Sequence, residues 1–86
     1  MRILVGDIGG TNTRLALFDG HALDMLSVYQ NQEIHDIHTM VQGYASDHGP
    51  MDAVILGIAG PVVGESVSMV NYHWTISAKR LRTTLD

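Results

Sequence analysis

The sequence predicts an α/β fold in which a three-stranded antiparallel meander is joined by a crossover helix to a parallel strand. Three short strand-like segments in residues 3–29 are separated by glycine-rich turns, and apolar residues in 34–44 recur at helical spacing. Residues 53–59 form a continuous apolar run, which is typical of a strand buried on both faces of a parallel sheet. A strand, a helix and a second such strand place the last strand beside the first, with a right-handed crossover.

The first 29 residues predict strands joined by tight turns. The apolar run at residues 3–5, closed by a Gly-Asp pair, suits a buried strand. Residues 9–12 suit a turn because glycine and asparagine accept positive φ, and the strand pattern resumes at residues 14–18. The Asp-Gly pair at 19–20 predicts a two-residue hairpin turn, followed by a third strand over residues 21–29. The residues predicted to share one face of this third strand are Leu23, Met25 and Tyr29.

A crossover helix is predicted from apolar residues that recur at helical spacing between positions 34 and 44. Its apolar positions are Ile34, Ile37, Met40, Val41 and Tyr44. Asn31 is the expected N-cap, and Glu33 and Asp36 lie where the helix dipole favours negative charge. The Gly-Pro pair at 49–50 ends the helix.

The last third of the sequence predicts a small hairpin and a final helix. Residues 62–70 would form two short strands with a Gly-Glu turn at 64–65. Ser77 is the expected cap of a helix over residues 78–85. The side chains of this helix predicted to face inward are Leu81 and Leu85.

Composition and charge exclude several classes of function. With 86 residues the chain is one small domain or a piece of a larger one. The formal net charge is −4, and the basic cluster Lys79, Arg80 and Arg82 suits a solvated helix face better than a nucleic-acid site. There is no cysteine for a disulfide or a thiolate metal site. The apolar runs are too short for a signal peptide or a membrane span, so we expect a cytoplasmic protein without a membrane partner.

Two histidines, His35 and His38, are three residues apart on the predicted helix and share a face. This spacing can bind a metal ion, but no third ligand is evident in the sequence, so we expect a solvated helix face. A third histidine, His73, is expected to make a local hydrogen bond.

The most informative segment is the glycine-rich stretch at residues 6–14. It is not a Walker loop, because no Gly-Lys-Ser/Thr follows, and it is not a dinucleotide fingerprint, because a strand comes next. Gly9 and Gly10 lack a Cβ, so an anion can approach the backbone, where successive N–H groups would form a nest. Thr11 adds a hydroxyl donor and Asp7 a carboxylate, which beside phosphates requires a cation such as Mg²⁺. The same residues also suit an ordinary tight turn capped by Asp7, and spacing alone does not separate the two.

Two ordered motifs in the sequence resemble bacterial glucokinases. Asp-Ile-Gly-Gly-Thr-Asn at residues 7–12, followed by Arg-Leu-Ala-Leu at 14–17, is similar to their first phosphate motif. The second motif comprises Ile-Ala-Gly-Pro-Val at 58–62, Gly-Glu at 64–65, Val-Asn at 70–71, Trp74 and Ile-Ser at 76–77. The resemblance covers essentially the whole chain. It implies the N-terminal part of a ribonuclease H-like, actin-like ATPase domain of the hexokinase type.

The resemblance also implies roles for individual residues. Those implied to line the phosphates of ATP are Gly6, Asp7, Ile8, Gly9, Gly10 and Thr11. Asp7 would help to hold Mg²⁺ through water, and Arg14 would support the loop or the sheet. Asn71 and Trp74 would lie near the sugar side of the cleft, neither of them as a catalytic residue. The implied cofactors are ATP and Mg²⁺, and the implied substrate is glucose.

The sequence departs from the family pattern at the catalytic step. The general base of the family is an aspartate that follows an asparagine, in a strand beyond a helix like residues 78–85. No Asn-Asp pair occurs in this sequence, so we expect no catalytic residue within it and no phosphoryl transfer by these residues alone. Residues 1–86 would form the incomplete N-terminal (small) domain of a two-domain sugar kinase. The activity implied for that parent enzyme is ATP-dependent phosphorylation of glucose to glucose 6-phosphate.

Two alternatives stay open at this point. A related sugar kinase of the same fold could act on another acceptor, because the residues that select the sugar are not identified in this sequence. The chain could also be a catalytically inactive truncated or binding fragment. That alternative predicts exposed apolar surface along residues 53–59 and self-association, for example as a homodimer.

Overall fold

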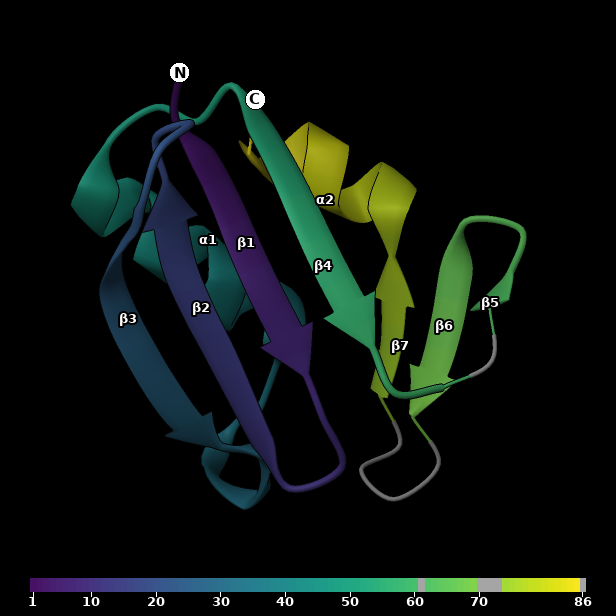
Figure 1. Ribbon diagram of the computed structural model, residues 1–86. Coiled ribbons are helices and arrows are strands. Elements are labelled where there is room, and N and C mark those ends of the chain that lie inside the picture. The colour runs from purple at the N-terminus through teal and green to yellow at the C-terminus, as the bar shows by residue number, and fades with distance from the viewer. Residues whose placement is uncertain (61, 70–73, 86) are drawn as a thin grey trace.

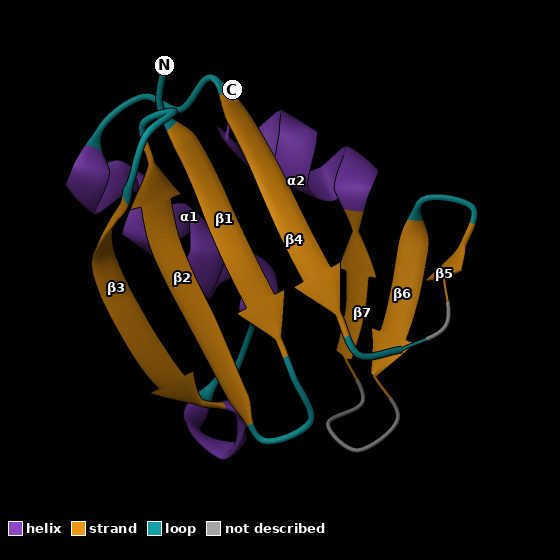
Figure 2. Cartoon of the chain, in the orientation of Figure 1, coloured by secondary structure: helices purple, strands orange, loops and turns teal. Residues whose placement is uncertain are grey.

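The computed structural model describes residues 1–60, 62–69 and 74–85. These residues form a four-stranded sheet, a three-stranded sheet and two α-helices, which lie on the same face of the larger sheet (Figures 1 and 2). The strands are β1 (Ile3–Ile8), β2 (Asn12–Phe18), β3 (Leu23–Gln30), β4 (Ala53–Ile58), β5 (Val62–Val63), β6 (Ser66–Met69) and β7 (Trp74–Ser77). The helices are the 3₁₀ turn η1 (Asn31–Glu33), α1 (Ile37–His48) and α2 (Ala78–Leu85). Within the described residues, no helix is both long and apolar enough to cross a bilayer.

The larger sheet has the strand order β3-β2-β1-β4. β1 pairs antiparallel with β2 and parallel with β4, so Leu4 lies between Leu17 on one side and Val54 on the other. The predicted meander and the predicted parallel strand are therefore confirmed. β1 runs on to Ile8, beyond the predicted end of residues 3–5. The reason is that the strand pairs with both neighbours, and this double ladder overrides the weak strand propensity of glycine and aspartate.

Gly6 lies in β1 where side chains from the two neighbouring strands meet beneath it. A Cβ at this position would lie 2.6 Å from Cδ2 of Leu56 and 2.7 Å from Cδ2 of Leu15. Leu15 is fully buried and has no free space to move into. Close packing here therefore requires a residue without a side chain, which is glycine. The buried apolar cluster under the sheet comprises Leu4, Ile8, Leu15, Ile37, Val41, Tyr44, Ala45, Trp74, Ile76 and Leu81.

The turn between β2 and β3 is longer than predicted, because residues 19–22 form it rather than an Asp-Gly pair alone. The Asp19 carboxylate accepts hydrogen bonds from the N–H groups of His21 and Ala22, at 2.8 and 3.0 Å. The hydrogen bonds from Ala22 and His21 lower the pKa of Asp19. Gly20 takes the left-handed φ of 101° that the turn requires. An Asp-based turn of this kind stabilises the longer connection.

A β-bulge in β3 breaks the predicted alternation. The register shifts between the partners of Leu15 and Leu17, and Met25 has a φ of 55°. Leu23 and Met25 are exposed, whereas Tyr29 packs against the core, so the prediction that these three residues share a face is wrong. The physical reason is that a bulge inserts an extra residue into one strand and disrupts the alternation there.

The helix α1 begins later than predicted, because Asp36 rather than Asn31 is its N-cap. The Asp36 carboxylate accepts hydrogen bonds from the His38 N–H and the Thr39 hydroxyl, both at 3.0 Å. Asn31 lies in the separate turn η1, where its side chain is hydrogen-bonded elsewhere. The helix stops before Gly49, which has a left-handed φ of 88°, as predicted.

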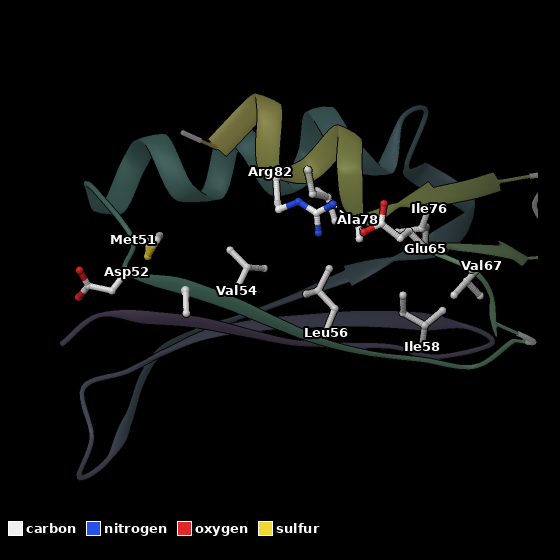
Figure 3. Close-up of a pocket in the computed structure, with 13 residues that line it drawn as sticks. Met51, Asp52, Val54, Leu56, Ile58, Glu65, Val67, Ile76, Ala78 and Arg82 are labelled. Atoms are coloured by element: carbon white, nitrogen blue, oxygen red, sulfur yellow. Dashed lines mark hydrogen bonds and ion pairs between the residues drawn. The ribbon is translucent and has the colours of Figure 1, made fainter.

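Within the described residues, β4 is covered on one face only. Val54, Leu56 and Ile58 point toward α2 and pack against the core (Figure 3). On the opposite face Ile55 is 60% exposed. The prediction that residues 53–59 are buried on both faces is therefore wrong for this chain, because both α-helices lie on the same side of the sheet.

The smaller sheet has the order β5-β6-β7 and is antiparallel throughout. The predicted hairpin is confirmed, with Gly64 in the left-handed region at its turn (φ 61°). The third strand, β7, is not predicted from sequence because it is too short to show a clear alternation. In the structure Trp74 and Ile76 are buried on one face of it. Ser77 caps the helix that follows, as predicted, by accepting a hydrogen bond from the Arg80 N–H at 3.2 Å.

The helix α2 keeps its basic side chains in solvent, as predicted. The exposed basic residues are Lys79, Arg80 and Arg82. Arg82 pairs with Glu65 at 2.7 Å and so links α2 to the turn between β5 and β6. Leu81 is buried as predicted, whereas the Leu85 side chain lies outside the described part of the structure.

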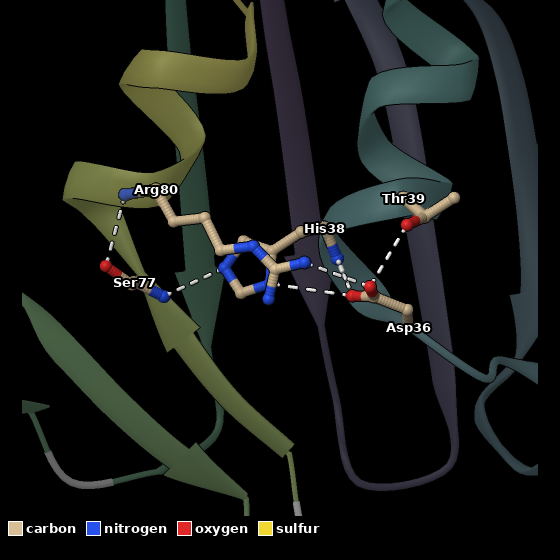
Figure 4. Close-up of polar contacts among 5 residues, drawn as sticks. All are labelled: Asp36, His38, Thr39, Ser77 and Arg80. Atoms are coloured by element: carbon tan, nitrogen blue, oxygen red, sulfur yellow. Dashed lines mark hydrogen bonds and ion pairs between the residues drawn. The ribbon is translucent and has the colours of Figure 1, made fainter.

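His38 joins α1 to the end of β7 and is 2% exposed (Figure 4). Its Nε2 accepts a hydrogen bond from the Ser77 N–H at 3.1 Å, and its Nδ1 lies 3.6 Å from one carboxylate oxygen of Asp36. Arg80 reaches the other oxygen of that carboxylate at 3.0 Å. The predicted solvated helix face is wrong for His38, which is buried and faces the second sheet. His35 is exposed as predicted, but it precedes the helix.

The electrostatics of this junction favour a neutral His38. Burial lowers the pKa of His38, and the charge of Arg80 lowers it further, against the opposing effect of Asp36. An unprotonated Nε2 is also what accepting the Ser77 N–H requires. Partial desolvation raises the pKa of Asp36, but hydrogen bonds from Thr39 and His38 and the charge of Arg80 outweigh it and lower that pKa overall.

The burial of His38 predicts that stability falls on mild acidification. Because the folded-state pKa of His38 lies below its unfolded value of about 6.5, its stabilisation is fully present above about pH 6.5. It is lost as the pH falls toward the folded-state pKa, since the unfolded chain then binds the extra proton. The free energy of unfolding, measured by urea denaturation from about pH 8 to about pH 5, should fall by at most about 1.4 kcal/mol per pH unit from this group.

A matched pair of variants isolates His38. His38→Gln keeps an uncharged acceptor for the Ser77 N–H and should lose most of the slope, whereas His35→Gln changes an exposed histidine and should keep it. The lowered pKa of Asp36 contributes stability that is lost only below about pH 3.8, outside this window. Equal slopes for the wild type and His38→Gln would contradict the assignment.

Close packing at Gly6 predicts that Gly6→Ala destabilises the fold by about 1–3 kcal/mol, because the new Cβ overlaps two core leucines. Gly10→Ala is the control, since a Cβ there meets nothing within 4 Å and should change stability by less than about 0.5 kcal/mol. Urea denaturation measures both. The packing argument fails if the two variants are equally stable.

Candidate functional site

The glycine loop, residues 9–11, connects β1 to β2 at the carboxyl ends of β1 and β4 (Figure 1). These two strands are parallel, and where they end the Ile8 carbonyl accepts a hydrogen bond from the Ala59 N–H at 2.9 Å. In open α/β sheets, ligands bind outside the carboxyl ends of the parallel strands. The loop therefore lies where such a site is expected.

The backbone of the loop differs from the prediction. Neither Gly9 nor Gly10 has a left-handed φ, so a nest that alternates right- and left-handed residues is absent from the loop. The Gly9 N–H donates to the Asn12 carbonyl at 3.0 Å, and a Cβ on Gly9 would lie 3.2 Å from that oxygen. A Cβ on Gly10 would meet nothing within 4 Å. Gly9 therefore permits the closure of the loop, whereas Gly10 leaves open space beside it.

The residues predicted to line the phosphates fall into two groups in the structure. Gly10, Thr11 and Asp7 are exposed and can meet a ligand. Ile8 is fully buried, so its side chain belongs to the core, and Gly6 lies inside the sheet between two leucines. The groups available to a ligand are therefore the tip of the loop and the Asp7 carboxylate.

Asp7 and Arg14 face each other across β1 and β2, with the Asp7 carboxylate 3.8 Å from a guanidinium nitrogen of Arg14. Their side chains are 69% and 53% exposed, so the pair contributes at most about 1 kcal/mol to stability. Among the described residues, no group of three or more His, Asp or Glu side chains could hold a metal ion. A single carboxylate still fits Mg²⁺, which keeps several waters and takes further ligands from phosphates.

Two buried polar residues beneath the loop escape prediction from the sequence. Thr13 and Asn31 are 0% and 1% exposed, and the Thr13 hydroxyl donates to Asn31 Oδ1 at 2.8 Å. Asn31 Nδ2 in turn donates to the Gly9 carbonyl at 2.8 Å. A signal exists in the sequence, because Thr13 shares the core-facing alternation of Leu15 and Leu17, where a hydroxyl needs a partner.

Of the two residues predicted for the sugar side, only Trp74 lies within the described part of the chain. Trp74 is 9% exposed and belongs to the core cluster, so packing accounts for its burial and its substrate-side role stays a prediction. Asn71 lies outside the described residues, as does His73, for which a local hydrogen bond was expected.

A groove of about 680 Å³ lies between β4 and α2 (Figure 3). Val54, Leu56 and Ile58 contribute apolar side chains to it, and the paired Arg82 and Glu65 also line it. Its described lining includes no residue of the glycine loop. The groove therefore suits apolar contact, and the loop is the better candidate for an anionic ligand.

Comparisons with known proteins identify the family to which the chain is related. A family model for glucokinase matches residues 4–86. Glucokinases of Salmonella typhi and Colwellia psychrerythraea are 33% and 35% identical over 85 and 86 residues, and each alignment covers 95% of this chain. The crystal structure of a glucokinase from an Antarctic psychrotroph matches with a TM-score of 0.81 and 27% identity, over 96% of this chain and 29% of that one.

The matches cover most of this chain but only part of each relative. This chain spans 26% of the length of each of the two curated relatives. The family model, in contrast, matches nearly the whole of this chain. The solved neighbour confirms the predicted fold class, the N-terminal part of an actin-like ATPase domain. The chain therefore belongs to the glucokinase family.

Proposed function

We propose that the chain supplies the phosphate-binding loop of a kinase that phosphorylates glucose with ATP, giving glucose 6-phosphate. Residues 1–86 would form the N-terminal part of a two-domain cytoplasmic enzyme that uses ATP and Mg²⁺. The relatives are named glucokinases, and that name supports glucose as the acceptor. The observation that carries the proposal is the exposed glycine loop at the carboxyl ends of two parallel strands, near the Asp7–Arg14 pair.

Each exposed group near the loop has a part in holding phosphate. The Gly10 N–H and the Thr11 hydroxyl would donate hydrogen bonds to phosphate oxygens. Arg14 would offset part of the negative charge of Asp7, which repels phosphates when no cation is bound. The Asp7 carboxylate would accept hydrogen bonds from waters of the bound cation. When bound, Mg²⁺ supplies neutralisation of the charge on the β- and γ-phosphates.

These roles of the exposed groups match the chemistry of phosphoryl transfer, in which catalysis depends on positioning and on electrostatic stabilisation. The groups around the loop are hydrogen-bond donors, one carboxylate and one guanidinium, and they bind and orient the nucleotide. The contribution of this segment to the reaction is therefore phosphate binding, and deprotonation of the sugar hydroxyl is assigned to a base outside these groups.

The role of Asp7 predicts a specific effect of Asp7→Asn on nucleotide binding. The wild-type chain should bind ATP more tightly with Mg²⁺ than in the presence of a chelator, because the carboxylate repels metal-free phosphates. Asp7→Asn should weaken binding with Mg²⁺ by about tenfold and remove most of this preference. Isothermal titration calorimetry on the 86-residue chain, with and without a chelator, measures both affinities.

Asp47→Asn is the matched control, because it makes the same change of charge at an exposed position near the end of α1. It should keep the wild-type preference for Mg²⁺. If Asp7→Asn also keeps that preference, Asp7 does not hold the metal. If the wild type binds no ATP under either condition, the proposed function of the loop is wrong.

A further inference from the structure

We propose that Asn31 is a positioning residue for the glycine loop, which fixes the peptide between Gly9 and Gly10 so that the Gly10 N–H faces a bound phosphate. The inference rests on the phosphate-binding function proposed above and adds to it a residue from another part of the chain. Asn31 follows β3 in sequence, whereas the loop connects β1 to β2.

Asn31 holds the loop from below through two hydrogen bonds. Its side-chain Nδ2 donates to the Gly9 carbonyl at 2.8 Å, and its main-chain N–H donates to the Thr11 carbonyl at 2.9 Å. These two carbonyls lie on either side of Gly10 in the sequence. At 1% exposure Asn31 cannot reach a ligand itself, so any effect on binding must pass through the loop.

Because the peptide unit is planar, the hydrogen bond to the Gly9 carbonyl also sets the direction of the Gly10 N–H. In a trans peptide the carbonyl and the following N–H point in opposite directions. Because the Gly9 carbonyl points to Asn31, the Gly10 N–H points away from Asn31 and out of the interior of the protein. Gly10 is exposed and, as a glycine, could adopt other orientations at little steric cost. Asn31 therefore selects one of several accessible loop conformations.

The chemistry of the contact requires an amide. The Gly9 carbonyl oxygen can only accept a hydrogen bond, so Asn31 must present its nitrogen there and its oxygen to the Thr13 hydroxyl, which donates at 2.8 Å. An aspartate of the same shape would place a carboxylate oxygen against that carbonyl oxygen. Asn31→Asp therefore breaks the side-chain contact with Gly9 without leaving a cavity, whereas Asn31→Ala removes that side chain and keeps only the main-chain hydrogen bond to Thr11.

A role in folding alone would change stability and leave the affinity of the folded chain for nucleotide unchanged. The test therefore compares the wild type, Asn31→Asp and Asn31→Ala with Val41→Ala, a core variant on α1 that leaves the loop contacts intact. The affinity for ATP with Mg²⁺ is measured by calorimetry at a temperature where circular dichroism shows each chain folded. We expect about tenfold weaker binding for both Asn31 variants and a change below about twofold for Val41→Ala.

A milder variant keeps the inference testable if the Asn31 variants do not fold. Thr13→Val removes the hydroxyl that orients the amide but keeps Asn31, and it should weaken binding by about threefold. The inference would be overturned if a folded Asn31 variant bound ATP like the wild type. If neither Asn31 variant folds, wild-type affinity in Thr13→Val would overturn it.

A measurement without ligand separates this inference from the proposed function. The residual dipolar coupling of the Gly10 N–H reports its direction and should change in Asn31→Asp but not in Val41→Ala. An unchanged coupling in Asn31→Asp would overturn the inference even if the wild type binds ATP. A wild type that binds no ATP would overturn the phosphate role of both the loop and Asn31, whatever the coupling shows.

Discussion

β1 pairs along its length with two neighbours, antiparallel with β2 and parallel with β4, and the remainder of the fold is arranged around this double ladder. The antiparallel neighbour places a turn directly after β1, and the parallel neighbour brings a second carboxyl strand end to the same edge. Close packing under the ladder requires a glycine at position 6. The position of the glycine loop is thus a consequence of how one strand is paired.

The loop joins a solvent-facing group of polar residues to a buried one. Asp7 and Arg14 are more than half exposed, so their charges contribute little to stability and remain available to a ligand. Thr13 and Asn31 are buried, where an unpaired polar group is costly, so their hydrogen bonds fix the backbone above them. A similar contact, in which the Ser77 N–H donates to the buried His38 side chain, holds the second sheet to α1. The buried hydrogen bonds therefore hold the backbone of the loop, and the exposed charges are the groups to which we assign phosphate binding.

The meander, the crossover helix and the parallel strand can be predicted from periodicity and turn residues, because those patterns are local. The choice between Asn31 and Asp36 as the helix N-cap cannot be predicted in this way, because local rules rank the two residue types alike. The Asn31 side chain instead bonds to Gly9, 22 positions away, which leaves Asp36 as the cap. The burial of His38 depends in the same way on Ser77, 39 positions away. In the candidate site, the motif predicts the exposed loop, and strand alternation indicates that Thr13 faces the core. The pairing of Thr13 with Asn31, and of Asn31 with the loop, follows only from the tertiary structure.

The central claim, that the glycine loop binds the phosphates of ATP, is tested most directly by titrating the ¹⁵N-labelled chain with ATP and Mg²⁺ and following its amide resonances. The account predicts saturable shifts that are largest at Gly10 and Thr11 and extend to Asp7, with Val54 and Leu81 in the groove beside α2 unaffected. Shifts centred on that groove, or no saturable shift at the loop, would contradict it.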